Sequence, residues 1–570
     1  MNLSPGRRLR HVGPIAGLAA QQGLVASAGY DNRVILWDAR TRQALAGGSH
    51  DHLVNHCAFS PDGRWLVSAG SDASARIWAV PEMRLQAVLA GHDDDVDMAL
   101  FSPDGRLIAS CALDRCVRIF DLGGRCLHTL QGHQGNVLSL AWSPDSRELV
   151  SSSVDGTLRW WDAIQGKALR IADLSVRTDT VEIAPDGVAY AGDDLGRIAI
   201  LCAGQADFID AHQAGIKKIV LDAERGLLLS LSYDRTLAVW RISAVAGKAP
   251  RLKEISRSTL PAIAWARSAA ILDDGKIAVG TFGGTYAVFD PLSSTWDLQG
   301  VAAGPALNAL CQIDGRTWSV GDAGIVQLDG QTVAEMGSLC NFLVAVGKRI
   351  VTGGQLGQLF DAQTGKLLYQ HPSPLNCGVS FERQGLPHLA IGSYTGEILI
   401  FALAVNGDLN LVTELAVYDN AVKGLSWSDS QLCSVCASTE ISWHDCHDWA
   451  LIRRIPGAHQ RIANACCAIG TGGFATVGRD RTLRVWTDGV AELYPSPHPN
   501  SVKCIAVNAA RTLLLTGSYG GTLAAFDLAG RRWLGMSRPT DAGISSIVWD
   551  NDDGHFLASS YDGQIYPVPA

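Results

Sequence analysis

Two stretches of the chain are copies of one pattern, and they decide the fold. Gly91–Leu122 reads GHDDDVDMALFSPDGRLIASCALDRCVRIFDL, and Gly132–Ala163 reads GHQGNVLSLAWSPDSRELVSSSVDGTLRWWDA. Each stretch contains three segments in which apolar and polar residues alternate, as in strands with one buried face. The turns between them carry Pro, Asp, Gly and Ser, which suit tight hairpins. The pattern therefore predicts an all-β unit.

The residue that closes the third segment can be followed along the whole chain. Successive copies are 39 to 43 residues apart, except for spacings of 49 and 32 residues near the middle. A period of about 40–45 residues is typical of one four-stranded blade of a β-propeller. The fourteen closing positions are Trp37, Trp78, Phe120, Trp161, Ile200, Trp240, Phe289, Leu328, Phe360, Phe401, Trp443, Trp486, Phe526 and Val568.

Fourteen blades are too many for one ring, because propellers usually have about 4–8 blades. A chain of 570 residues also exceeds what one hydrophobic core accommodates. The two irregular spacings bracket the middle of the chain. We therefore expect two seven-bladed propellers, formed by residues 1–300 and 301–570.

Four residue types recur at fixed offsets within many of these repeats: a His, a Ser or Thr, an Asp and the closing Trp. The constellation resembles the structural tetrad of the WD40-repeat family, in which these side chains form a buried hydrogen-bonded chain. The resemblance implies two seven-bladed WD40 propellers, and it gives the repeated His, Ser and Asp residues a structural role, not a hydrolytic one. The complete sets are His11, Ser27, Asp31 and Trp37; His50, Ser68, Asp72 and Trp78; His133, Ser151, Asp155 and Trp161; His212, Ser230, Asp234 and Trp240; and His459, Thr476, Asp480 and Trp486.

Other repeats keep only part of the set. The repeat ending at Phe120 has the first three members but lacks the indole donor. Asp194 and Asp322 stand at the spacing of the tetrad Asp without a complete set around them. Between residues 290 and 450 the motif is weakest, and blades are expected there on spacing alone.

The ends of the chain raise the question of how the rings close. Residues 7–10 could form a lone outer strand, and residues 564–568 form a third strand with nothing after it. Because an unpaired strand edge is a liability, we expect residues 7–10 to complete the last blade of the second ring as a clasp, and residues 295–300 to complete blade seven. The alternative is that each ring closes independently.

Composition excludes several classes of function. A net charge of −9 gives no general attraction to nucleic acid or to an anionic membrane. No apolar run is long enough to cross a bilayer. The 14 cysteines are scattered, as in a protein with reduced thiols, which favours a cytoplasmic location. No nucleotide-binding or hydrolase motif is present, so no cofactor and no enzymatic activity are expected.

One segment resembles a metal site in composition. It contains Cys433, Cys436, His444, Cys446 and His447, and such ligands suit zinc. Cys433 and Cys436 stand three apart on one expected strand, so their side chains point to opposite faces. Packed thiols and an exposed loop are the preferred interpretation, and no metal is assigned.

Charged residues near the blade loops are the candidates for binding a partner. Propellers present such loops on a rigid disc. We therefore expect a non-catalytic scaffold that binds proteins or peptides, and the alternative is a sensor that captures a short peptide or small ligand in a central channel. The candidate residues are Asp93, Asp94, Asp95, Asp97, Lys217, Lys218, Lys423, Arg461 and Lys503.

Overall fold

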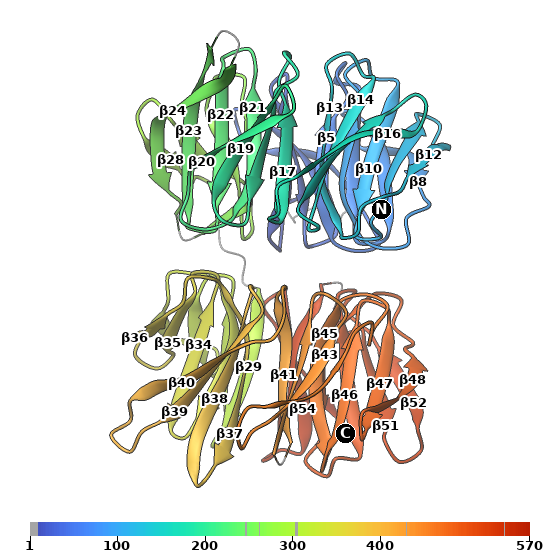
Figure 1. The fold of residues 1–570 in the computed structure, drawn as a ribbon. Coiled ribbons are helices and arrows are strands. Elements are labelled where there is room, and N and C mark those ends of the chain that lie inside the picture. Colours follow the sequence, from blue (N-terminus) through green and yellow to red (C-terminus); the bar gives the residue numbers. More distant parts are fainter. Residues whose placement is uncertain are drawn as a thin grey trace. The chain divides into compact units, whose positions relative to one another are not determined.

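The computed structural model describes residues 9–245, 248–261, 263–301, 306–428, 430–540 and 542–569. The chain divides into two compact units, Met1–Ala302 (unit 1) and Ala303–Ala570 (unit 2). Each unit is built from seven antiparallel sheets whose strands follow one another in the sequence (Figure 1). The all-β architecture of two seven-bladed propellers is thereby confirmed. No helix that could cross a membrane is found among the described residues.

The blades of unit 1 each contain four strands. They are β1–β4 (Ile15–Gln21, Leu24–Gly29, Arg33–Asp38, Ala44–Ser49), β5–β8 (Val54–Phe59, Trp65–Gly70, Ser74–Ala79, Arg84–Leu89), β9–β12 (Val96–Phe101, Leu107–Ala112, Val117–Asp121, Cys126–Leu130), β13–β16 (Val137–Trp142, Glu148–Ser153, Thr157–Asp162, Lys167–Asp173), β17–β20 (Thr178–Ile183, Ala189–Asp193, Arg197–Cys202, Gln205–Asp210), β21–β24 (Ile216–Asp222, Leu227–Ser232, Thr236–Val245, Lys248–Thr259) and β25–β28 (Ala264–Ile271, Ile277–Thr281, Ala287–Asp290, Thr295–Asp297).

The blades of unit 2 follow the same order. They are β29–β32 (Leu307–Ile313, Arg316–Gly321, Ile325–Leu328, Gln331–Glu335), β33–β36 (Cys340–Val346, Arg349–Gly354, Gln358–Asp361, Leu367–Gln370), β37–β40 (Leu375–Arg383, Leu386–Ser393, Glu397–Leu403, Leu409–Ala416), β41–β44 (Val422–Ser428, Gln431–Cys436, Ile441–Asp445, Leu451–Ile455), β45–β48 (Ala463–Gly470, Gly473–Gly478, Thr482–Thr487, Val490–Pro495), β49–β52 (Val502–Val507, Leu513–Ser518, Leu523–Asp527, Arg532–Ser537) and β53–β55 (Ile544–Asp550, His555–Ser560, Ile565–Pro569).

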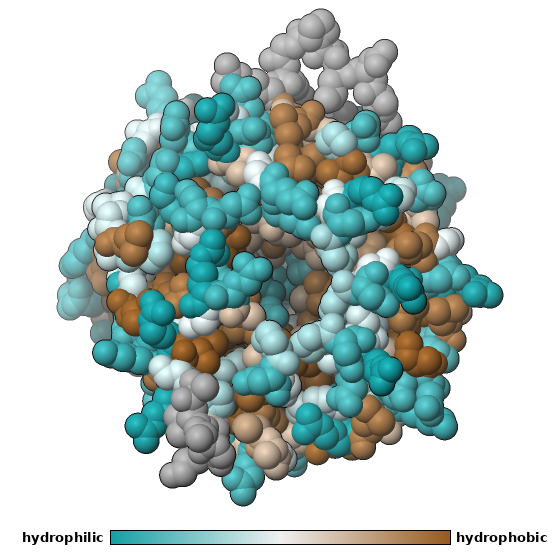
Figure 2. Space-filling model, turned by 90° about the horizontal axis from the view of Figure 1, so that it is seen from above, coloured by the Kyte–Doolittle hydropathy of each residue, from teal (hydrophilic) through white to brown (hydrophobic). Residues whose placement is uncertain are grey.

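The first strand of every blade is the innermost one and contacts the first strands of the two neighbouring blades. These contacts run around each unit without a gap, because β1 meets β25 in unit 1 and β29 meets β53 in unit 2. Figure 2 looks onto unit 1 and shows a hollow at the centre of its ring, surrounded mostly by hydrophilic residues. Each unit is therefore a closed ring around a central channel.

The core lies between neighbouring blades and not within a single one. One buried cluster joins Cys111 and Val117 of the third blade to Leu149 and Trp161 of the fourth. Equivalent clusters fill the spaces between the other blades. The middle strands are buried on both faces, as β14 is, whereas the outer strands are mostly exposed, as β16 is.

The predicted clasp is not found in the described part of the N-terminal segment. Residues 7 and 8 lie outside the described residues. Leu9 packs in the cluster of Ile15 and Tyr286, and the backbone of His11 exchanges two hydrogen bonds with Gly284, at 3.0 and 2.9 Å. All of these residues belong to unit 1. Residues 9–11 therefore tie the first blade of unit 1 to the seventh, and β28 completes that seventh blade as expected.

The last blade of unit 2 has three strands in the described part of the chain, and β55 is its outer edge. This strand contains Pro567 and Pro569, which lack a backbone N–H and cannot donate to a further strand. The edge is therefore protected by its sequence. The ring does not need a fourth strand at this blade, because closure depends on the inner strands β29 and β53.

A bulge at the second residue of the inner strand is common to the blades. At five of these positions the bulged residue is an Asn whose side-chain amide donates to a backbone carbonyl of the next inner strand, at 2.6–3.0 Å. The link was not predicted from sequence, although the residue type is regular. The donors are Asn55, Asn308, Asn341, Asn376 and Asn464.

We predict that Asn464→Ala destabilises unit 2 by about 1–3 kcal/mol, because the buried carbonyl of Val502 loses its 2.7 Å amide donor. Hydrogen–deuterium exchange of the full chain, read by mass spectrometry, should show faster exchange in β45 and β49. An exposed control, Asn406→Ala, should leave these strands unchanged. Unchanged protection in the Asn464 variant would show that the link contributes no stability.

Candidate functional site

The structure brings together the four members of every complete tetrad. In the blade of Trp78 the indole Nε1 donates to Ser68 Oγ at 2.7 Å, and Ser68 Oγ lies 2.7 Å from His50 Nε2. In all five complete sets the corresponding distances are 2.7–2.8 Å, and the His Nδ1 lies 2.8–3.1 Å from the Asp carboxylate.

The hydrogen bonds of a tetrad all point in the same direction, from the Trp to the Asp. Trp78 donates to Ser68, the Ser hydroxyl donates to His50 Nε2, and His50 Nδ1–H donates to Asp72. Burial lowers the pKa of His50, which keeps the ring neutral as this order requires. Burial alone would raise the pKa of Asp480, but hydrogen bonds from His459 outweigh it and hold that pKa at about 2. The tetrads therefore have a structural role: they hold the loop that carries the His to its blade.

Several blades replace members of the tetrad by other polar groups. Tyr418 takes the place of the His in the blade of Trp443, and its hydroxyl lies 2.9 Å from Ser434 and Ser442. His498 lies 2.9 Å from Thr516 and 2.6 Å from Thr522, so Thr522 substitutes for the Asp. The spacing of His498 before Phe526 matches the other repeats, and this signal was missed in the sequence.

A second set of polar residues, besides the tetrads, lies at the end of each unit where the inner strands begin. We call this end of the ring the channel mouth. At this end the residue after the second strand donates its backbone N–H to the segment before the inner strand, in all fourteen blades. Sequence spacing placed Asp194 and Asp322 at the tetrad position, but both occupy this mouth position, one residue earlier in the turn. The bulged residues of the inner strands lie beside them.

In unit 1 the mouth is occupied by internal ion pairs. Lys217 Nζ lies 2.6 Å from both Asp179 and Asp194, and Arg177 lies 3.0 Å from Asp179. Arg267 pairs with Asp97 at 3.3 Å across the ring. Lys217 was a candidate for binding a partner, but its side chain is nine-tenths buried and its charge is neutralised by two carboxylates.

The acidic run Asp93–Asp97 is divided by the fold. Asp93 is exposed and its backbone N–H donates to the tetrad carboxylate of Asp114 at 3.2 Å. Asp94 is half-buried and Asp95 is buried, while Asp97 enters the channel mouth. The run is therefore not a continuous acidic surface.

Lys218 lies further inside the ring of unit 1 than its sequence position indicated. Burial raises the pKa of Glu182 to about 7, and the nearby Lys218 opposes this shift. Burial lowers the pKa of His56 to about 3, and Lys218 acts in the same direction. These three half-buried residues come from three different inner strands, so Lys218 belongs to the channel lining.

The mouth of unit 2, like that of unit 1, holds lysines over aromatic rings; in unit 1 Lys217 lies over Tyr233 at 4.6 Å. Lys503 lies over the ring of Tyr519 at 5.7 Å, and Lys423 lies over Tyr394 at 5.4 Å. Both lysines are bulged residues of inner strands, β49 and β41. Arg461 lies in the loop just before β45 and is half-buried. Three of the candidate residues thus belong to the mouth region of one unit.

Asp322 is a buried carboxyl at this mouth. Its Oδ1 accepts a hydrogen bond from Asn308 at 2.9 Å, whereas its Oδ2 has no partner among the described residues. Burial raises the pKa of Asp322 to about 7. Burial also raises the pKa of Tyr561 well above its ordinary range, and the nearby Tyr519 and Asp322 add to the shift. A carboxyl, three tyrosines and two lysines therefore meet in one place.

The Cys and His residues around Trp443 do not gather into one site in the described structure. Cys433, Cys436 and Cys446 are buried, and burial raises the pKa of Cys446 to about 12. The one set of three potential ligands within 4.8 Å among the described residues is Asp550, Asp553 and His555. There, Asp550 already accepts from Gln312 of the neighbouring blade at 2.9 Å.

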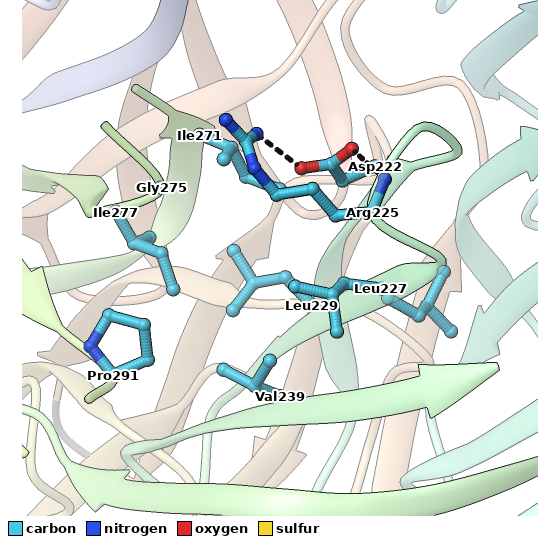
Figure 3. A pocket seen from close by; sticks show the side chains of 10 residues that line it. Asp222, Arg225, Leu227, Leu229, Val239, Ile271, Gly275, Ile277 and Pro291 are labelled. Carbon is cyan, nitrogen blue, oxygen red and sulfur yellow. Dashed lines mark hydrogen bonds and ion pairs between the residues drawn. The ribbon is translucent and has the colours of Figure 1, made fainter. Parts of the chain in front are cut away.

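A small apolar notch lies between the sixth and seventh blades of unit 1 (Figure 3). Leu227, Leu229, Val239 and Ile277 line it, and the ion pair between Arg225 and Asp222, at 2.7 Å, lies over one side. Its volume of about 20 Å³ is close to that of a single water probe. The notch is therefore a packing defect, not a ligand pocket.

We predict that unit 2 loses stability as the pH falls from 7 to 5, partly through His498. Burial lowers the folded-state pKa of His498 to about 4. Between that value and the unfolded value of about 6.5 the unfolded chain binds more protons, so stability falls with pH by about 2 kcal/mol. In His498→Gln the exchange protection of β50 should depend less on pH. An unchanged pH dependence would contradict this assignment.

We predict that Asp322→Asn stabilises unit 2 at pH 8 by about 2–4 kcal/mol. The raised pKa means that folding keeps the Asp322 carboxyl protonated between about pH 4 and 7, where the unfolded chain is ionised. Burial of the Asp322 carboxyl therefore destabilises the folded chain increasingly as the pH rises to 7. The side-chain amide of the Asp322→Asn variant does not ionise, so the variant lacks this destabilisation. Exchange protection of β29 and β30 measures the gain, which should vanish near pH 4. A gain of equal size at both pH values would show that ionisation of Asp322 is not its cause.

Comparison with known proteins agrees with the tetrad geometry. The family model described as WD domain, G-beta repeat matches residues 44–79, 83–121 and 124–162. The human WD repeat-containing protein 36 is 40% identical over 65 residues, which is 11% of this chain and 7% of that protein. Ribosome assembly protein 4 of Saccharomyces cerevisiae is 40% identical over 57 residues, covering 10% of this chain and 11% of its own length.

A longer match joins the chain to WD repeat-containing protein 55 of Pongo abelii. The two are 24% identical over 183 residues, which is 31% of this chain and 48% of that protein. The chain thus spans less than half the length of these relatives. Together with the five complete tetrads, the matched repeats show that the chain belongs to the WD40-repeat family.

Proposed function

We propose that the protein is a non-catalytic scaffold that binds protein segments, and that the mouth of unit 2 is one recognition site. The family supports the first part, since WD40 domains generally mediate protein–protein interactions. The observation that carries the second part is the buried carboxyl of Asp322, whose Oδ2 has no described partner beside a cluster of tyrosines. A buried acceptor without a donor costs free energy that a ligand donor would recover.

The contrast with unit 1 supports this choice of site. At the equivalent bulged position, Lys217 is held between two carboxylates at 2.6 Å. Both lysines lie over a tyrosine ring, Lys217 over Tyr233 at 4.6 Å and Lys503 over Tyr519 at 5.7 Å, but no carboxylate among the described residues pairs with Lys503. Tyrosines are common at recognition sites because they offer a large rigid surface and a polar hydroxyl. The mouth of unit 2 therefore combines apolar contact with groups that orient a ligand.

A catalytic role has little support in the same residues. The His, Ser and Asp residues that resemble hydrolytic groups are hydrogen-bonded to one another as blade supports. A small ligand in the channel, the alternative function, would use the same Asp322 and Lys503. The two functions differ in whether a partner protein co-purifies with the chain.

We also propose a cytoplasmic location and reduced thiols. All fourteen cysteines are free, and most lie singly inside blade strands. Burial raises the pKa of Cys57, Cys340 and Cys504, so these thiols stay protonated and unreactive. Fractionation of the native cells tests the location.

We expect the double variant Lys503→Glu and Tyr519→Ala to lose its partner protein. Tagged full-length chains would be purified from the native organism, and co-purifying proteins quantified by mass spectrometry. A partner bound at the mouth should fall by about tenfold or more, as expected when a central contact is lost. Arg84→Glu, an exposed change on β8, serves as the matched control. Equal recovery of every partner by the double variant would refute the site.

A further inference from the structure

The sixth blade of unit 1 carries an outer hairpin unlike the others. Its strands β23 (Thr236–Val245) and β24 (Lys248–Thr259) have 10 and 12 residues, and every other third or fourth strand has 8 or fewer. Since β23 begins beside the tetrad Asp234, the extra length projects at the end of the ring opposite the channel mouth (Figure 1). The hairpin is therefore an addition to the blade, not a requirement of it.

One face of the extension is fixed to the blade. Ile242 and Leu252 pair across the two strands and pack against a buried cluster that includes Leu228 and Trp240. Ala249 joins the same cluster. Because this face is packed, the opposite face is held in a defined orientation, which lowers the entropic cost of binding at it.

The opposite face is strongly basic. Arg241 is directly across from Lys253, and Ser243 is across from Arg251. Residues two apart on a strand share a face, so the three cations lie together, and all three are exposed. Like charges placed directly opposite each other destabilise a strand pair. No described carboxylate forms an ion pair with any of the three.

The acidic residue next to Lys253 in the sequence, Glu254, does not neutralise this surface. Glu254 is bound by Arg257 through two hydrogen bonds, at 3.0 and 2.5 Å. Arg257 in turn donates to the carbonyl of Ala211 at 2.8 Å and so is anchored to the preceding loop. The basic face of Arg241, Arg251 and Lys253 is thus maintained on a chain whose net charge is −9.

We propose that this basic face binds an acidic polypeptide segment of a partner protein. Charge complementarity selects the acidic partner and steers its approach. β24 is the outer edge of its sheet, so an extended polypeptide could also pair with its backbone, which a nucleic acid cannot do. Single-stranded nucleic acids are held largely by aromatic stacking, and the basic face contains no aromatic residue. The inference does not depend on the channel-mouth site proposed above.

The test is binding of a fluorescein-labelled peptide of alternating Glu and Thr residues to the full-length chain, followed by fluorescence anisotropy. The variant R241E/R251E/K253E should weaken binding about tenfold or more, and added salt should weaken binding to the unchanged chain. The control R84E/R147E/K167E changes the net charge equally, at three scattered exposed positions of unit 1. It should bind within about twofold of the unchanged chain.

A second variant tests whether charge reversal itself, by causing misfolding, accounts for the loss of binding. Arg251→Ser with Lys253→Ser removes two cations without adding acids, and it should show an intermediate loss. The proposal is overturned if the unchanged chain does not bind the peptide, or if both triple variants weaken binding equally. It is also overturned if a single-stranded DNA of the same charge binds more tightly than the peptide.

Discussion

Each ring depends on the contact between its first and last inner strands. All blades are formed from consecutive strands, so in the described structure no strand is exchanged to lock the circle. Closure is left to the packing of β1 on β25 and of β29 on β53, to the backbone bonds of His11 with Gly284, and to the Asn amides that join inner strands. A blade cannot bury its own faces, so stability comes from its neighbours.

This dependence explains why polar side chains are so regular inside an apolar ring. A tight turn between β-strands leaves backbone and side-chain donors near the core, and buried polar groups must be paired. The tetrads satisfy them within a blade, and the Asn amides satisfy them between blades. Where the His is lost, Tyr418 or another hydroxyl fills the same space, so the hydrogen-bonding requirement persists after the motif has diverged.

Periodicity was sufficient to predict the fold, since the closing positions, aromatic or aliphatic, mark every blade, including those between Phe289 and Trp443 where the motif is weak. The sequence could not predict ring closure, because whether residues 7–10 reach the last blade depends on three-dimensional contacts, and Leu9 packs in unit 1 instead. Among the site residues, Asp194 and Asp322 were assigned to the tetrad by counting six residues back from Ile200 and Leu328, but both lie at the mouth position, one residue earlier in a turn of the usual length. In the blade of Ile200 the residue paired as the closing Trp is paired elsewhere is Leu201, a one-residue difference in register that spacing does not show. The role of Lys217 was also hidden, because its two carboxylate partners come from the preceding blade.

Charged groups that stabilise the rings and charged groups proposed for recognition lie in different places. In unit 1 the mouth charges come in mutually neutralising pairs within a blade, between adjacent blades and across the ring, so few of them are available to a ligand. At Asp322 and on the β23–β24 hairpin, by contrast, polar groups lie where the described structure supplies no counterpart. Such positions cost stability, and closed rings tolerate them because neighbouring blades supply the stabilising contacts. Recognition in this protein is therefore best sought where local energetics are unfavourable, and not in the conspicuous His, Ser and Asp repeats.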